Sequence, residues 1–167
     1  MSPSSANTAL VDDSRLEQAI GHLVRLVNAE SLSGVEALAV DEAERIAEEL
    51  ELAVTRMSVE EGRDNLLVGA CSPQVILCTH LDTVPPYIPA TRDQHYVHGR
   101  GSADAKGIAI AMMHALAALK GEEQDEGVAC LLVVGEETDH KGAMAAAASS
   151  LKPTHIILGE PCGLIPA

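Results

Sequence analysis

Aromatic side chains are almost absent from this 167-residue chain, which contains Tyr87 and Tyr96 but neither tryptophan nor phenylalanine. Proteins that bind bases or sugars by stacking need such rings, so this scarcity argues against that kind of ligand. Hydrophobic residues still make up 47% of the chain, and most are leucine, valine, isoleucine, alanine and methionine. They are numerous enough for one domain with a sizeable core and argue against disorder of the whole chain.

Positive charge is scarce as well. The chain carries 11 lysine and arginine residues against 25 aspartate and glutamate residues, a net charge of −14. Phosphate groups and anionic lipid surfaces are bound by clustered lysine and arginine, so we expect neither nucleic acid nor a membrane as a partner. The acidic runs at 41–51 and 122–126 are typical of a solvated helix face and a solvated loop.

The cysteines show no paired spacing, and long apolar runs are missing. Cys71, Cys78, Cys130 and Cys162 form no Cys-x-x-Cys pair, so the sequence indicates neither a thiolate zinc site nor a redox pair. The first residues lack the basic start and apolar stretch of a signal peptide, and no apolar run approaches the length of a membrane span. These absences predict a cytoplasmic protein.

Apolar spacing switches repeatedly between the helical and the strand period along the chain. Ser14 and Glu17 have the spacing of a capping box, which predicts that the first helix begins at Ser14. The patterns predict helices at 14–28, 38–50, 105–119 and 141–150, strands at 51–57, 65–69, 75–78, 127–134 and 155–158, and either a small strand or a hairpin arm at 93–98. The last three of these strands are short apolar runs typical of central strands, and residues 1–12 are expected to form a flexible tail.

Strands that alternate with helices predict an α/β fold. We expect a three-layer sandwich, in which a mixed, centrally parallel sheet is covered by helices on both faces. Ligands of such sheets bind beyond the carboxyl ends of the strands. Six polar residues follow a predicted central strand or open a predicted helix: His80, Asp82, Asp104, Glu136, Glu137 and Glu160. The pattern therefore predicts that these side chains converge at one edge of the sheet.

His80 and Asp82 are suited to a metal site because residues two apart in an extended chain face the same way. Asp82 can accept a hydrogen bond from one ring nitrogen of His80 while the other nitrogen binds a metal. A lone histidine at a strand end is more often only a satisfied polar residue. Asp104 has an equally plain alternative, since aspartate is favoured as a helix N-cap. Its string, 99–107, fits neither a dinucleotide fingerprint nor a phosphate loop.

Glu136 and Glu137 are adjacent carboxylates directly after a predicted strand. In a partly closed site two such charges repel and need a cation or a proton, so one can bind a metal while the other acts as a base. The alternative is an exposed pair in a loop. Glu160 also follows a strand, and on its own it is as readily a loop residue as a ligand.

Read together, four strings resemble a known family: THLDTVP at 79–85, HGRGSADAKG at 98–107, GEE at 135–137 and GEP at 159–161. They are similar to the dinuclear zinc hydrolases that include acetylornithine deacetylase, succinyl-diaminopimelate desuccinylase, aminoacylase and glutamate carboxypeptidase. Their order and spacing agree over nearly the whole chain. The resemblance implies a metal-dependent hydrolase of amide bonds, with an N-acyl amino acid as the first choice of substrate and a small peptide as the second.

The resemblance also implies a role for each residue. His80 and Glu160 would bind one metal, Glu137 the other, and Asp104 would bridge the two. Asp82 would orient His80, and Glu136 would take a proton from the metal-held water and deliver it to the leaving amine. The implied cofactors are two divalent ions, most often Zn²⁺, with Co²⁺ as a substitute.

Full-length members of this family continue with a lid or dimerisation domain and the rest of the catalytic domain, which supplies a further histidine ligand. The resemblance thus implies that residues 13–167 form the N-terminal portion of a catalytic domain, with those later parts absent, and it is compatible with a homodimer of a full-length form. Activity would then depend on residues outside this chain. The alternative is a non-catalytic domain that keeps the fold and works by binding.

Overall fold

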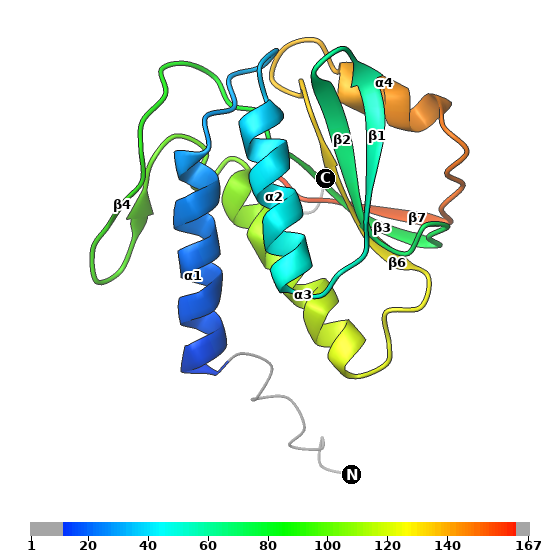
Figure 1. Cartoon of the computed structure of the whole chain (residues 1–167), viewed down its shortest axis with the longest axis horizontal. Helices are drawn as coiled ribbons and strands as arrows, with labels where there is room; N and C mark the ends of the chain where they lie inside the picture. The colour runs from blue at the N-terminus through cyan, green and yellow to red at the C-terminus, as the bar shows by residue number, and fades with distance from the viewer. Residues whose placement is uncertain (1–11, 163–167) are drawn as a thin grey trace.

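A five-stranded sheet runs through residues 12–162, the part of the chain that the computed structural model describes (Figure 1). In spatial order its strands are β1 (Val54–Glu60), β2 (Arg63–Gly69), β6 (Val128–Val133), β3 (Val75–His80) and β7 (His155–Leu158). β3 is parallel to both β6 and β7, whereas β2 is antiparallel to β1 and β6. The sheet is therefore mixed, with its parallel strands at one side.

Helices lie on both faces of this sheet (Figure 1). α1 (Asp13–Asn28), α2 (Ala37–Glu49) and α3 (Lys106–Gly121) form one layer, and α4 (Lys141–Ala148) packs on the opposite face against β1 and β2. Alternate residues of a strand point to opposite faces, so Leu66 of β2 joins the core under the three helices, while Leu67 joins the core on the side of α4. The prediction of an α/β sandwich is confirmed. None of the described helices has the length and apolarity needed to cross a membrane.

The first helix begins earlier than the sequence predicted. Its N-cap is Asp12, whose side chain accepts a hydrogen bond of 2.8 Å from the main-chain nitrogen of Arg15, so the capping box at Ser14 is wrong. Glu17, the second residue of the predicted capping box, instead binds the guanidinium of Arg92 through its carboxylate, at 2.7 and 2.8 Å. The predicted tail at 1–12 lies outside the described residues except for Asp12.

Two strand predictions also need correction. β1 starts at Val54 rather than Glu51, because Glu51 and Leu52 follow the end of α2 and their main-chain nitrogens bond back to the main-chain oxygens of Glu48 and Ala47. β7 was expected to be central, yet it lies at the edge of the described sheet, where Leu158 is 72% exposed. A continuous apolar run predicts a strand, but it does not fix the position of that strand in the sheet order.

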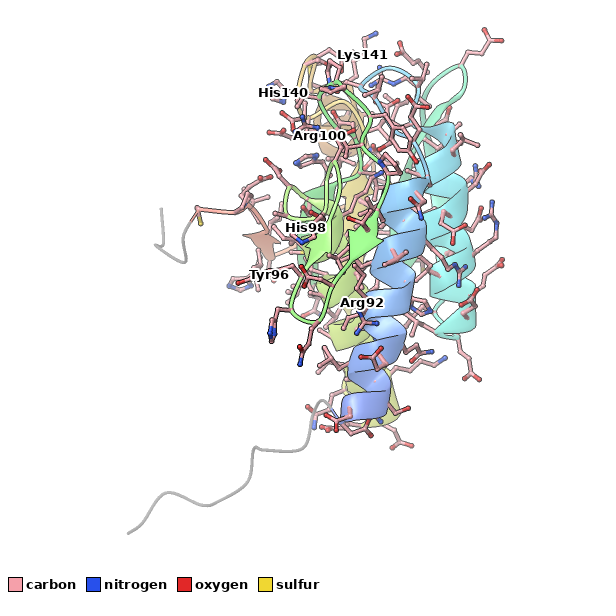
Figure 2. The ribbon with its side chains drawn as sticks, turned by 90° about the vertical axis from the view of Figure 1, so that its left-hand side faces the viewer. Arg92, Tyr96, His98, Arg100, His140 and Lys141 are labelled. Atoms are coloured by element: carbon pink, nitrogen blue, oxygen red, sulfur yellow. The ribbon has the colours of Figure 1, made fainter. Side chains whose placement is uncertain are left out.

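The predicted hairpin arm consists of β4 (Thr91–Arg92) and β5 (Val97–His98), and Figure 2 shows Tyr96 and His98 on it, with Arg92 beside α1. The turn is organised by Asp93, whose carboxylate accepts hydrogen bonds from the main-chain nitrogens of His95 and Tyr96, at 2.7 and 2.8 Å, and lies 3.0 Å from Nε2 of His98.

These contacts give a prediction about pH. The hydrogen bond from His98, followed by the two amides, lowers the pKa of Asp93 to about 2. Because this pKa lies below the ordinary value of about 3.9, the carboxylate supports the turn above that value and loses its contribution only as the pH falls through about 2. The carboxyl ¹³C signal of Asp93 should stay at its ionised position from pH 6 to pH 3. In a His98→Ala variant it should begin to titrate in that window, and a wild-type midpoint near 3.9 would contradict the assignment.

Candidate metal centre

The predicted site residues meet where strands of the sheet end. His80 is the last residue of β3, and its Nε2 atom lies 3.0 Å from Oδ1 of Asp104. The same atom lies 3.8 Å from Oε2 of Glu136, which follows β6, and 3.9 Å from Oε2 of Glu160, which follows β7. His80, Asp104 and Glu137 each offer one ligand atom, and these atoms lie within 4.8 Å of one another. Segments up to 80 residues apart in the sequence thus form one cluster.

Asp82 connects the histidine to the two glutamates. It is fully buried, its Oδ1 lies 3.4 Å from Nδ1 of His80, and its main-chain oxygen lies closer to that nitrogen, at 3.0 Å. Its carboxylate also accepts hydrogen bonds from the main-chain nitrogens of Glu136 and Glu137, at 2.9 and 3.1 Å, and from the hydroxyl of Ser33, at 2.7 Å. Asp82 therefore positions the backbone of both glutamates as well as the ring of His80.

The charges of the cluster favour a bound cation. Burial alone would lower the pKa of His80, but Asp82 outweighs it and raises the pKa to about 9. Burial alone would likewise raise the pKa of Asp82, yet its hydrogen bonds, the one from His80 first, lower it to about 2. Burial and neighbouring carboxylates raise the pKa of Glu137 and of Glu160. Excess negative charge of this kind is what a metal ion relieves, so one imidazole and several carboxylates form a donor set that fits divalent metals.

Asp104 is not a helix cap. The N-cap of α3 is Ala105, and no side chain caps that helix. The Asp104 carboxylate is instead 52% exposed and directed at the ring of His80. The alternative that the sequence left open is therefore wrong for this residue, and its side chain is free to bind a ligand.

Two glycines help to place the carboxylates that follow β6 and β7. Gly135 has a φ of +72°, which glycine adopts readily, and it turns the chain from β6 into the Glu136–Glu137 loop. Gly159 pairs with β3 through its nitrogen, which donates to the main-chain oxygen of Cys78 at 2.8 Å. A Cβ on Gly159 would lie 2.4 Å from a side-chain carbon of Ile108, so a larger residue here would force that neighbour on α3 to shift.

Three supporting contacts were missed in the sequence. The first is Ser33, which binds Asp82 from the loop between α1 and α2. The second is the buried ion pair of Glu36 with Arg63, next to the Glu136–Glu137 loop. The third is Lys106, whose buried ammonium donates to main-chain oxygens of α1 and its C-cap. A charged residue two positions after Asp104 was a signal for Lys106, whereas nothing local marks Ser33.

The other histidines lie outside the cluster. His22, for which no partner was predicted, packs against His114 between α1 and α3, with Nδ1 of His22 3.0 Å from Nε2 of His114. His98 binds Asp93 in the hairpin arm, and His140 lies beside the start of α4 (Figure 2). The histidine of the predicted site is therefore His80.

Comparison with known proteins identifies the scaffold. Residues 76–165, more than half of the chain, match the sequence pattern described as Peptidase family M20/M25/M40. The chain belongs to this family. The matched region includes every one of the six predicted site residues, and the M20 fold accounts for the mixed sheet that places them.

Individual M20 relatives agree in fold and differ in length. The "Probable carboxypeptidase" of Aspergillus flavus is 34% identical over a match that covers 69% of this chain and 31% of that protein. A tripeptidase from Staphylococcus aureus superposes with a TM-score of 0.70 at 25% identity, covering 86% of this chain and 43% of that one. The YXEP protein of Bacillus subtilis, a dinuclear metal binding peptidase from the M20 family, shares the fold with a TM-score of 0.61 at 17% identity, covering 93% and 45%. The chain thus spans about a third of the length of the curated relatives it matches.

Proposed function

We propose that the protein containing this chain hydrolyses an amide bond in a small substrate, with two divalent metal ions at the cluster around His80. The observation that carries the proposal is the convergence of one buried imidazole with the carboxylates of Asp104, Glu136 and Glu160 on an M20 scaffold. Glu137 lies within the same ligand group. The named activities of relatives, a carboxypeptidase and a tripeptidase, support hydrolysis of amide bonds.

The proposed ligands are those that the family resemblance implies. His80 and Glu160 would hold one ion and Glu137 the other, with Asp104 between them, and the short distances among these side chains support their lying in one site. Imidazole with carboxylates suits Zn²⁺, and Co²⁺ is a usual substitute. When bound, such ions polarise the scissile carbonyl and lower the pKa of water.

Proton transfer is assigned to Glu136. Its side chain is 38% exposed, so it is open to substrate, while its main chain is held by Asp82. The carboxylate accepts a proton from the attacking water, the water oxygen bonds to the carbonyl carbon, and the proton then passes to the nitrogen as the C–N bond breaks. The products are a carboxylic acid and an amine.

Two classes of substrate are proposed, and both contain an amide bond. An N-acyl amino acid remains the first choice, as in acetylornithine-deacetylase-like hydrolysis, and short peptides are the second. Both present an amide bond beside a small amino acid. The carboxypeptidase and tripeptidase names of relatives support the peptide class.

Metal removal tests the proposal in the whole protein. Chelation should abolish hydrolysis of N-acetyl amino acids or dipeptides, and Zn²⁺ should restore it with two ions bound per chain by elemental analysis. His80→Ala should lower the metal content, whereas His98→Ala, which changes an exposed histidine of the hairpin arm, should leave it unchanged. Protein that binds no metal and hydrolyses neither substrate would favour a non-catalytic binding domain.

A further inference from the structure

Lys106 is a buried cation that has no carboxylate within ion-pair distance among residues 12–162. The residue is 1% exposed, and its ammonium donates to the main-chain oxygens of Leu26, at 3.0 Å, and Ala29, at 2.7 Å. Burying an ammonium is costly unless hydrogen bonds compensate. The compensation here comes from the carboxyl end of α1, where the helix carries partial negative charge.

The carboxyl end of α1, to which Lys106 donates hydrogen bonds, is followed by residues that contact the end of β3, where His80 and Asp82 lie. Directly after α1, the hydroxyl of Ser31 donates to the main-chain oxygen of Leu81 at 2.7 Å, and the hydroxyl of Ser33 donates to Oδ2 of Asp82 at 2.7 Å. The carboxyl end of α1 is therefore fixed to one half of the metal cluster.

Lys106 also contacts the loop that carries Asp104, the other part of the cluster. It stands two residues after Asp104, and its main-chain nitrogen donates to the oxygen of Gly101 at 2.9 Å, which closes the loop that carries Asp104. The side chain is buried, and its Cδ lies 3.2 Å from where a Cβ on Gly101 would be, so its aliphatic stem packs against the same loop.

We propose that Lys106 is a positioning residue: its ammonium ties the Asp104 loop to the carboxyl end of α1 and so sets the separation of Asp104 from His80. The proposal rests on the proposed function, because it assigns Lys106 to the same metal site. The ammonium of Lys106 is bonded to main-chain oxygens of Leu26 and Ala29, and it is not itself proposed as a ligand. It acts through Asp104, whose carboxylate must face the ring of His80 at the observed 3.0 Å.

Lys106→Met in the whole protein tests this, because methionine keeps most of the stem and removes the donor. Lys120→Met is the matched control: Lys120 lies on the same helix and also donates to a main-chain oxygen, that of Glu51, but at the end remote from Asp104. Co²⁺ titration followed by visible absorption should show metal binding weakened roughly 10–100-fold in Lys106→Met, with an altered spectrum and a fall in kcat larger than the change in KM. Lys120→Met should bind Co²⁺ like the parent protein.

A purely structural role would give a different result. If folded Lys106→Met binds two Co²⁺ ions with the parental affinity and spectrum and has lost only thermal stability, the proposal is overturned. Should Lys106→Met not fold, Lys106→Arg keeps a cation and donors in a different shape, and the same altered spectrum is expected of it. Parental binding by Lys106→Arg would then count against the proposal, because an unchanged site does not depend on the geometry of this contact.

The imidazole ¹⁵N signals of His80 separate this proposal from the proposed function. In metal-free protein they should shift in Lys106→Met and remain in place in Lys120→Met, because Nε2 of His80 lies 3.0 Å from Oδ1 of Asp104 and should sense a change in the Asp104 loop. A wild-type protein that binds no metal would end the proposed function, while a shifted His80 signal would still support the positioning role. Unshifted signals together with intact metal binding in the wild type would refute the positioning role alone.

Discussion

Replacing Glu136 with glutamine should lower kcat by roughly 10²–10⁴-fold, the range expected when a general base is removed. Glutamine has the shape of glutamate but cannot take the proton of the attacking water. The main-chain nitrogen of residue 136 still donates to Asp82, so the loop keeps its position. Measured in the whole protein, KM and the number of bound metal ions should change little.

Glu137→Gln provides the contrast because its carboxylate belongs to the ligand group with His80 and Asp104. That variant should lose metal as well as activity, although its main-chain bond to Asp82 is retained. An active Glu136→Gln protein would show that the base is another group. Loss of metal from Glu136→Gln would show instead that Glu136 is a ligand, and the two glutamates would have to exchange roles.

Much of the fold and most of the cluster were predictable from local pattern. The switch between periods of 3.6 and 2 residues marks the helices and strands, and the carboxyl ends of parallel strands meet at one edge of a sheet. That reasoning was enough to bring His80 to Glu136, although they are 56 positions apart in the sequence. It fails for β7, because strand order depends on which neighbours pair across the sheet and not on the apolarity of one run.

The contacts that support the cluster were beyond that reasoning. Ser33 donates to Asp82 across 49 positions, and Lys106 reaches Leu26 across 80. Such contacts depend on how a loop packs in three dimensions, and serines and lysines occur in many loops without them. The Asp82 carboxylate was predicted to face His80, yet its bonds to the amides of Glu136 and Glu137 follow only once β6 is placed beside β3.

The largest effect on stability is expected at Arg63, the first residue of β2. Its guanidinium holds the carboxylate of Glu36 through two hydrogen bonds, at 2.7 and 2.8 Å, and both side chains are at most 5% exposed. It also binds Glu60 at 2.6 Å and Asp139 at 3.1 Å. The bond to Glu36 outweighs burial and raises the pKa of Arg63 further above its ordinary value. Arg63 is therefore charged at all ordinary pH values.

Arg63→Met should lower the free energy of unfolding by about 3–5 kcal/mol, because it leaves the charge of Glu36 buried without its partner. The remaining donor to that carboxylate is the main-chain nitrogen of Gly34, at 2.8 Å. Nη2 of Arg63 also lies 2.5 Å from where a Cβ on Gly135 would be, so the Glu136–Glu137 loop should loosen together with the fold. Urea unfolding of the whole protein, with hydrolysis measured beside it, would record both effects.

Arg56→Met is the matched control for this prediction. Arg56 also binds carboxylates of α2, those of Asp41 and Glu44, but it is 37% exposed, so its loss should cost at most about 1 kcal/mol. In the double variant Glu36→Met/Arg63→Met neither charge of this pair remains, and much of the stability lost in Arg63→Met should return. If Arg63→Met costs no more than Arg56→Met, or if the double variant is less stable than the single one, the buried charge of Glu36 is not what makes Arg63 necessary.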